Sequence, residues 1–244
     1  MSQTIQRATE LIEFIAEDPR TLAEAAQRFD VHRSTVFRQL QTLERAGFLV
    51  HRSDGRYAIG PRFIAIAQQA LDRIDLRRVA HPHLAALQRR AGCTVHLAQL
   101  VDDGIVYVDK IEAASGVRMY SRIGRTVLPQ ATGVGKVILA QLDGDRRDRI
   151  LRDVEWRAYT PTTLTSRAAL DAELDRISQR GWGVDDSEFE EFTNCIAAPV
   201  ASSSGAVVGA ISLTSLRALH DLDALRAHLD DLLETAGRVS ADLG

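Results

Sequence analysis

A short segment near the amino terminus carries polar side chains at the spacing of one helix face. Between residues 34 and 46, a rotation of about 100° per residue gathers three apolar side chains on one side, Val36, Leu40 and Leu43. The opposite side carries Ser34, Arg38, Gln41 and Arg45. Because arginine can bond guanine bidentately and glutamine can pair with adenine, Arg38 and Gln41 are candidate readers of DNA bases.

The same region has a local excess of positive charge. Residues 28–62 contain seven arginines and three acidic residues, a local net charge of +4, so the remainder of this −3 chain carries −7. A basic block in an acidic protein suggests a module that binds a polyanion, although a solvated arginine-rich face would give the same count. Hydroxyl groups and the arginines of a following hairpin could hold phosphates. The predicted DNA contacts are Arg33, Ser34, Thr35, Arg38, Gln41, Arg45, Arg52 and Arg56.

A second group of polar residues lies in the carboxy-terminal half. In the run 207–214, a period of two places Ile211 and Leu213 on one face and the hydroxyls of Ser212 and Thr214 on the other. Solvent exposure of these hydroxyls is one interpretation, and a polar-lined pocket is the alternative. In that case Cys195, Asp185 and a glycine-rich loop would form other parts of the pocket wall. Backbone N–H groups near Gly133 could then donate to a carboxylate.

Motifs for catalysis and metal binding are sparse. Residues 133–137 superficially resemble a phosphate loop, but the first glycine is misplaced and no serine or threonine follows the lysine. Cys195 could act as a nucleophile, yet a lone cysteine that opens an apolar strand is more often a packing residue. His81 and His83 have no third ligand nearby in sequence, which favours a surface or capping role. We therefore expect neither an enzyme nor a bound metal or cofactor.

Three short helices and a hairpin must position the basic face. Thr21, followed three residues later by Glu24, is typical of a capping box, and Ser34 is the predicted N-cap of the third helix. The turn signal Ser53-Asp54-Gly55 separates two strand-like runs and completes a winged helix-turn-helix over residues 1–60. The expected helices span 4–17, 22–29 and 34–46, and the expected strands 48–52 and 56–59.

The remainder of the chain alternates helical and strand-like patterns. A helix over 62–78 would connect the winged helix to the second domain, and its apolar residues on more than one side suggest a role in a dimer. The expected fold class is α+β, with a mostly antiparallel sheet, and the expected domains are 1–60, 61–78 and 79–244. Strands are expected over 93–101, 105–111, 117–121, 195–201 and 206–214, and helices over 84–91, 134–142, 167–180 and 221–239.

The composition fits an intracellular globular protein. A length of 244 residues is enough for two ordinary domains. A composition of 45% hydrophobic and 26% charged residues is not typical of a disordered chain. No run of 18 apolar residues occurs and the first residues do not form a signal peptide, so we expect neither secretion nor membrane insertion. Two cysteines without CxxC spacing predict a reducing, cytoplasmic location.

An ordered set of motifs resembles the isocitrate-lyase-regulator (IclR) family of bacterial transcription regulators over nearly the whole chain. In the amino-terminal part the matching stretches are Thr21–Ala25, Arg33–Leu40 and Tyr57–Gly60. Further along they are Arg118–Gly124, Ala131–Lys136, Gly181–Glu188 and Cys195–Val200. Each stretch is weak alone, but the ordered set is highly specific.

The resemblance implies a winged helix, a connector helix and a GAF-like domain that binds a small organic acid. It also implies dimers that often pair as tetramers. Carried over by position, the carboxylate of the effector would meet Gly133, Val134, Asp185, Cys195, Ser212 and Thr214, with Met119 as a wall. Thr214 stands where similar proteins often have serine, so its methyl group could trim the cavity.

These observations predict a regulator that binds double-stranded operator DNA and responds to a small organic acid. A repressor that responds to a keto, hydroxy or sugar acid is the favoured interpretation. The alternatives are an activator that responds to an aromatic acid, a thiol-based redox sensor that uses Cys195, or a winged helix that contacts protein instead of DNA.

Overall fold

The computed structural model of the chain describes residues 3–72, 75–113 and 121–243. The chain divides into two compact units, Met1–Arg73 and Ile74–Gly244. The expected connector, residues 61–78, contains helix α4 (Arg62–Asp72) and the first residues of helix α5 (Asp75–Ala91). Among the described residues, none of the helices combines the length and the apolar character needed to cross a lipid bilayer.

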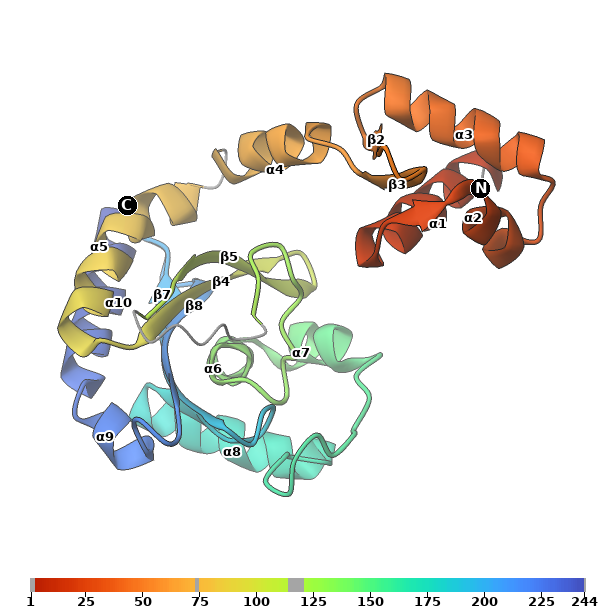
Figure 1. The fold of residues 1–244 in the computed structure, drawn as a ribbon. Helices are drawn as coiled ribbons and strands as arrows, with labels where there is room; N and C mark the ends of the chain where they lie inside the picture. The colour runs from red at the N-terminus through yellow and green to blue at the C-terminus, as the bar shows by residue number, and fades with distance from the viewer. Residues whose placement is uncertain (1–2, 73–74, 114–120, 244) are drawn as a thin grey trace. The chain divides into compact units, whose positions relative to one another are not determined.

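The amino-terminal unit contains three packed helices and a small antiparallel sheet, followed by α4 (Figure 1). The helices are α1 (Gln3–Glu17), α2 (Leu22–Phe29) and α3 (Arg33–Arg45). The sheet has the order β1 (Arg20–Thr21), β3 (Arg56–Ile59), β2 (Leu49–His51). Its core consists of Leu11, Ile15, Ala25, Ala26, Val36, Leu40, Leu49 and Tyr57. The apolar side of α3 is therefore buried, and its polar side is left outside.

Local capping explains where the second and third helices begin. The predicted capping box is confirmed: Thr21 Oγ1 accepts the N–H of Glu24 at 3.2 Å, and Glu24 Oε2 accepts the N–H of Thr21 at 2.7 Å. The expectation that Ser34 caps α3 is wrong, because the N-cap is His32 and α3 begins at Arg33. The imidazole Nδ1 of His32 accepts the N–H of Ser34 at 3.3 Å, so it fulfils the acceptor role expected of the serine hydroxyl.

The carboxy-terminal unit is an α+β domain with an antiparallel sheet, as predicted, and the sheet has five strands. Along the sheet the strands are β5 (Gly104–Ile111), β4 (Thr94–Val101), β8 (Val207–Leu216), β7 (Thr193–Ala201) and β6 (Gly183–Asp186). The helices are α5, α6 (Gly133–Ala140), α7 (Gly144–Leu151), α8 (Arg167–Arg180), α9 (Leu222–Arg226) and α10 (Leu229–Asp242). Figure 1 shows α5 and α10 on one side of the sheet and α6 and α8 on the other.

Each face of the sheet has its own apolar core. Val95, Ile196, Ile211 and Leu213 point to the α5 and α10 side, whereas Ala197 and Ala210 face α6 and α8. The alternation predicted for β8 is therefore observed, and the side chains of Ser212 and Thr214 lie on the α6 side. Small residues on this face let α6 pack closely against β7 and β8.

Several sequence-based expectations differ from the structure. Helix α7 and strands β1 and β6 were not predicted, the helix expected over 84–91 begins at Asp75 as α5, and the single closing helix expected over 221–239 is the pair α9 and α10. The strand expected over 117–121 lies almost entirely outside the described residues. Residues 124–127 pair with the edge of β5, since the N–H of Tyr107 donates to the carbonyl of Arg125 at 3.0 Å and the N–H of Val127 donates to that of Ile105 at 2.8 Å.

Candidate functional site

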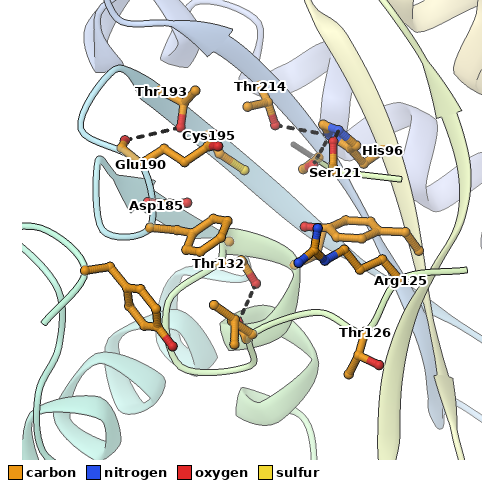
Figure 2. A pocket seen from close by; sticks show the side chains of 17 residues that line it. His96, Ser121, Arg125, Thr126, Thr132, Asp185, Glu190, Thr193, Cys195 and Thr214 are labelled. Atoms are coloured by element: carbon orange, nitrogen blue, oxygen red, sulfur yellow. Dashed lines mark hydrogen bonds between the residues drawn. The ribbon is translucent and has the colours of Figure 1, made fainter. Parts of the chain in front are cut away.

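A cavity of about 550 Å³ lies between the start of α6 and the polar part of the sheet (Figure 2). This volume is within the range of small-molecule sites. Every strand of the sheet contributes to its wall, through His96 on β4, Tyr107 on β5, Asp185 on β6, Cys195 on β7, and Ser212 and Thr214 on β8. The cavity is therefore a product of the whole sheet and not of one loop.

The first turn of α6 forms one end of the cavity. Thr132 is the N-cap, and its Oγ1 accepts the N–H of Gly135 at 3.2 Å. The N–H groups of Gly133 and Val134 have no acceptor within the helix, as in any first helical turn, and both residues line the cavity. Together with the positive end of the helix dipole, these donors favour an anionic group at this position.

Gly133 is required by its close approach to β7. A Cβ atom at this position would lie 2.8 Å from Cys195 Sγ and 3.3 Å from the Cβ of Ala197. Burial, together with the nearby Asp185 carboxylate, raises the pKa of the Cys195 thiol to about 12. A thiolate is therefore disfavoured at neutral pH, which opposes both a nucleophilic and a redox-sensing role. Cys195 instead forms the floor under the first turn of α6.

Asp185 lies beside this floor and belongs to a buried ionic cluster. Its Oδ1 accepts the N–H of Glu188 at 2.7 Å. Lys136, which has no solvent exposure, donates from Nζ to Glu188 Oε1. Burial, only partly offset by Lys136, raises the pKa of Asp185 to about 7 and also raises the pKa of Glu188. One lysine thus serves two buried carboxyl groups, and only Asp185 faces the cavity.

The turn that carries Glu188 is held in place by a threonine cluster. The backbone of Ser187 is left-handed, with φ of 57°. Thr162 Oγ1 donates to the carbonyls of Asp186 and Ser187, each at 2.9 Å, and Thr163 Oγ1 donates to that of Glu188 at 2.5 Å. These bonds fix the chain just after β6, so the carboxyl group of Asp185 has a defined position in the cavity wall.

His96 organises the hydroxyl groups on the sheet. Its Nδ1 lies 3.4 Å from Ser212 Oγ and 3.3 Å from Thr214 Oγ1, and its Nε2 lies 2.7 Å from Ser121 Oγ. Burial lowers the pKa of His96 to about 3, so the ring is neutral and bears one proton. The ring can therefore donate on one side and accept on the other. It connects β8 to the segment that follows residue 120.

Charged and aromatic groups complete the wall. In Figure 2, Glu190, Thr193 and Asp185 lie on one side of the cavity, and His96, Ser121 and Arg125 lie on the other. Two aromatic residues that line the cavity, Tyr159 and Phe189, pack edge to face with ring centroids 5.5 Å apart. The cavity thus combines hydrogen-bonding groups of both kinds with apolar surface.

The predicted DNA contacts lie on the amino-terminal unit and are mostly exposed. Arg33, Ser34, Thr35, Arg38 and Arg45 are exposed on α3, and Gln41 is half-buried. Within the described residues the guanidinium of Arg38 makes no hydrogen bond or ion pair, although its carbonyl accepts the hydroxyl of Thr42 at 2.8 Å. This face can therefore accept an external partner without first breaking internal contacts.

The two hairpin arginines differ from each other. They flank the turn, where the N–H of Arg52 donates to the carbonyl of Arg56 at 2.8 Å. The side chain of Arg52 is exposed, whereas the guanidinium of Arg56 donates to the carbonyl of Pro19 at 3.0 Å and lies 3.7 Å from Glu24 Oε2. Arg56 therefore also connects the hairpin to the start of α2.

Comparison with known families decides the class of protein. The family model for the IclR helix-turn-helix domain matches residues 4–53, and the model for the bacterial transcriptional regulator IclR C-terminal domain matches residues 68–241. The chain belongs to the IclR family. It is a DNA-binding transcriptional regulator and not an enzyme. The resemblance inferred from the sequence motifs is confirmed.

Individual relatives agree with this assignment to the IclR family. The chain is 35% identical over 224 residues to the HTH-type transcriptional regulator KdgR of Escherichia coli. This alignment covers 91% of this chain and 85% of KdgR. It is 31% identical over 217 residues to the transcriptional repressor IclR of Escherichia coli, covering 87% of this chain and 79% of the repressor. The crystal structure of Thermotoga maritima IclR superposes with a TM-score of 0.86, at 31% identity and full coverage of both chains.

Six of the seven predicted effector contacts of this IclR-family chain line one cavity: Gly133, Val134, Asp185, Cys195, Ser212 and Thr214. Met119 lies outside the described residues. Sequence reasoning did not single out His96, Arg125 or Glu190 as cavity residues. His96 had a detectable signal, because it alternates with Val95 and Leu97 in an otherwise apolar run. Arg125 and Glu190 lie in connecting segments, where no periodic pattern identifies them.

Proposed function

We propose that this IclR-family regulator is a repressor whose affinity for its operator is changed by a small organic acid bound in the cavity. The observation that carries the proposal is the convergence of Gly133, Val134, Asp185, Ser212 and Thr214 on one cavity at the amino-terminal end of α6. These residues come from three distant parts of the chain. Their combination of amide donors, hydroxyls and a carboxyl group suits an acid that also carries oxo or hydroxyl groups.

The polar lining supports keto, hydroxy or sugar acids as effectors. His96, Ser121, Thr126, Thr193, Ser212 and Thr214 supply groups that can pair with hydroxyls along a short carbon chain. A buried polar group left unpaired costs free energy, so an apolar ligand would be disfavoured here. The Tyr159–Phe189 pair is the one feature that favours the alternative of an aromatic acid. Repression is supported by the relative described as the transcriptional repressor IclR.

In this proposal residues 1–60 bind the operator, 61–78 connect the domains and 79–244 bind the effector. Arg38 and Gln41 would read bases, while Arg33, Ser34, Thr35, Arg45, Arg52 and Arg56 would position the protein on phosphates. We further propose that the regulator acts in the cytoplasm as a dimer or tetramer. Ile64 and Ile66 of α4, 72% and 45% exposed, support self-association through the connector.

The test is a mobility shift with DNA flanking the gene of the regulator, repeated with pyruvate, lactate, gluconate and 4-hydroxybenzoate. We expect specific binding that one of the first three acids weakens. Binding strengthened by an acid would instead indicate activation or corepression, and release by 4-hydroxybenzoate alone would indicate an aromatic effector. Absence of specific, salt-dependent binding would contradict the operator role.

Titration of the Ser212→Ala variant with the active acid tests the site itself. Loss of a hydroxyl that contacts the acid should weaken binding by about 0.5–1.5 kcal/mol, which is several-fold in Kd. Undiminished affinity would remove Ser212 from the site.

A further inference from the structure

We propose that the effector acid binds together with one proton, which is held between its carboxylate and Asp185, so that effector affinity rises as the pH falls. This inference rests on the proposed effector function and adds the charge state in which the site accepts its ligand. The regulator would then respond both to the concentration of the acid and to the pH through the same cavity.

The ionic cluster behind the cavity has one cation for two carboxyl groups. Lys136 forms its ion pair with Glu188, and no ion pair within 4.0 Å joins Asp185 to a cation among the described residues. Its carboxyl group accepts backbone N–H groups instead, from Glu188 at 2.7 Å and from Phe189. Asp185 is therefore the group in this cluster whose negative charge lacks a direct cationic partner.

The groups of β5 and β7 that face Asp185 are neutral. From β7, the Cys195 thiol is neutral, and from β5 the buried Tyr107 has a pKa raised above its ordinary value by burial, so it is neutral as well. Arg125 contributes a cation from across the cavity, and Glu190, on the same side as Asp185, contributes an acid whose pKa is also raised by burial. The lining thus carries one arginine against two acids, so an incoming carboxylate adds negative charge to a wall that already has an excess of acidic groups.

A carboxylate bound at the first turn of α6 would lie next to Asp185. The Cβ position of Gly133 is 3.7 Å from the backbone N of Asp185, so the amide donors and the acid share one corner. Two carboxylates in contact in a buried site do not both stay ionised, and they share one proton instead. Since burial raises the pKa of Asp185 to about 7, that proton is available near neutral pH.

The sign of the pH effect follows from this arrangement. Below about pH 7, Asp185 is already protonated and the acid binds without further proton uptake, so affinity reaches a plateau. Above that pH, each binding event must take up one proton, and Kd should rise up to about tenfold per pH unit. In an acidified cell, a given concentration of effector would therefore occupy the cavity more fully and have a larger effect on operator binding.

The experiment is titration calorimetry of the full chain between about pH 6 and pH 9, in buffers of different ionisation enthalpy, which counts protons directly. The probes are pyruvate and gluconate, with gluconamide as the analogue that lacks the carboxylate charge. We expect uptake that approaches one proton per acid bound at the alkaline end, and none for the amide. Binding of either acid with no proton uptake and no change of Kd with pH would overturn the proposal.

Matched variants identify the titrating group. Asp185→Asn keeps the size and removes the titration, so its residual binding of acid should lose the pH dependence. Asp186→Asn, at the adjacent exposed position of β6, should behave like the unaltered chain. An unchanged pH slope in a folded Asp185→Asn variant would contradict the assignment. Absence of binding by both acids and by 4-hydroxybenzoate at every pH would refute the effector site itself, a different result from pH-independent binding.

Discussion

The α3 face and the Asp185 corner of the cavity are built in opposite ways. On α3, the side chains of Arg33, Arg38 and Arg45 are exposed and make no ion pair within the described residues. In the corner, Asp185, Lys136 and Glu188 are buried and hold one another in place. Exposed groups that have no ion pair within the protein can be removed at little cost in stability. Groups that shape a buried site contribute to stability and to ligand binding together.

The largest expected effect is on the buried ion pair. Lys136→Met leaves the carboxylate of Glu188 buried without its cation and should lower the free energy of unfolding by about 3–5 kcal/mol. Denaturant unfolding followed by circular dichroism measures this. Arg149→Met is the control, because it breaks the ion pair between Arg149 and Asp103, two side chains that are each about half exposed. This change should lower the free energy of unfolding by less than about 1 kcal/mol. Equal, small effects would show that burial of the pair has no energetic consequence.

A smaller loss is expected where α6 approaches the sheet. Gly133→Ala places a methyl group 2.8 Å from Cys195 Sγ, which should cost about 1–3 kcal/mol of stability and displace the first-turn amides. Effector affinity should fall while operator affinity without effector is retained. Combining Gly133→Ala with Cys195→Ala should recover part of both losses, because the smaller side chain makes room. No recovery in the double variant would mean that the contact with Cys195 is not the cause.

On the α3 face the effect should fall on DNA and not on folding. Arg38→Ala should lose about 1–3 kcal/mol of discrimination at one base pair, with the free energy of unfolding changed by less than about 0.5 kcal/mol. Competition between operators with single base changes measures the discrimination. Affinity that falls equally for every sequence would assign Arg38 to phosphates instead of bases.

The smallest effect separates the two hairpin arginines. Arg52→Ala should weaken binding evenly across sequences and reduce the salt slope by about one, without loss of stability. Arg56→Ala should have the same effect on DNA and should also lower stability slightly, because its guanidinium bonds the Pro19 carbonyl. Salt titration and thermal unfolding of both variants test the difference. Lower stability for Arg52→Ala alone would reverse these roles.

The same contrast explains what the sequence could predict. Helices α2 and α8 begin and end where capping residues and apolar periodicity place them. Helix α7 was missed because its sequence is largely Arg and Asp and buries only Leu151, so it has no apolar period to detect. The closing helix was predicted as one because the leucine pattern continues across the break after Arg226.

The candidate site was only partly predictable for a related reason. The hydroxyls of Ser212 and Thr214 follow from strand alternation, but their contact with His96 depends on the pairing of β4 with β8, which sets His96 opposite Ser212. The ion pair between Lys136 and Glu188 joins residues 52 positions apart and needs the packing of α6 on the sheet. The side chains of the α3 face needed only one helical period, because Arg33, Arg38 and Arg45 form no ion pair with the other described residues.

Coupling between the cavity and the operator site is tested through its reciprocity. Operator affinity should be measured with and without the active acid, and acid affinity with and without operator. Both ratios should give the same coupling free energy, about 1–3 kcal/mol, and Gly133→Ala should abolish it. An acid affinity that does not change when the operator is present would show that the cavity has no part in regulation.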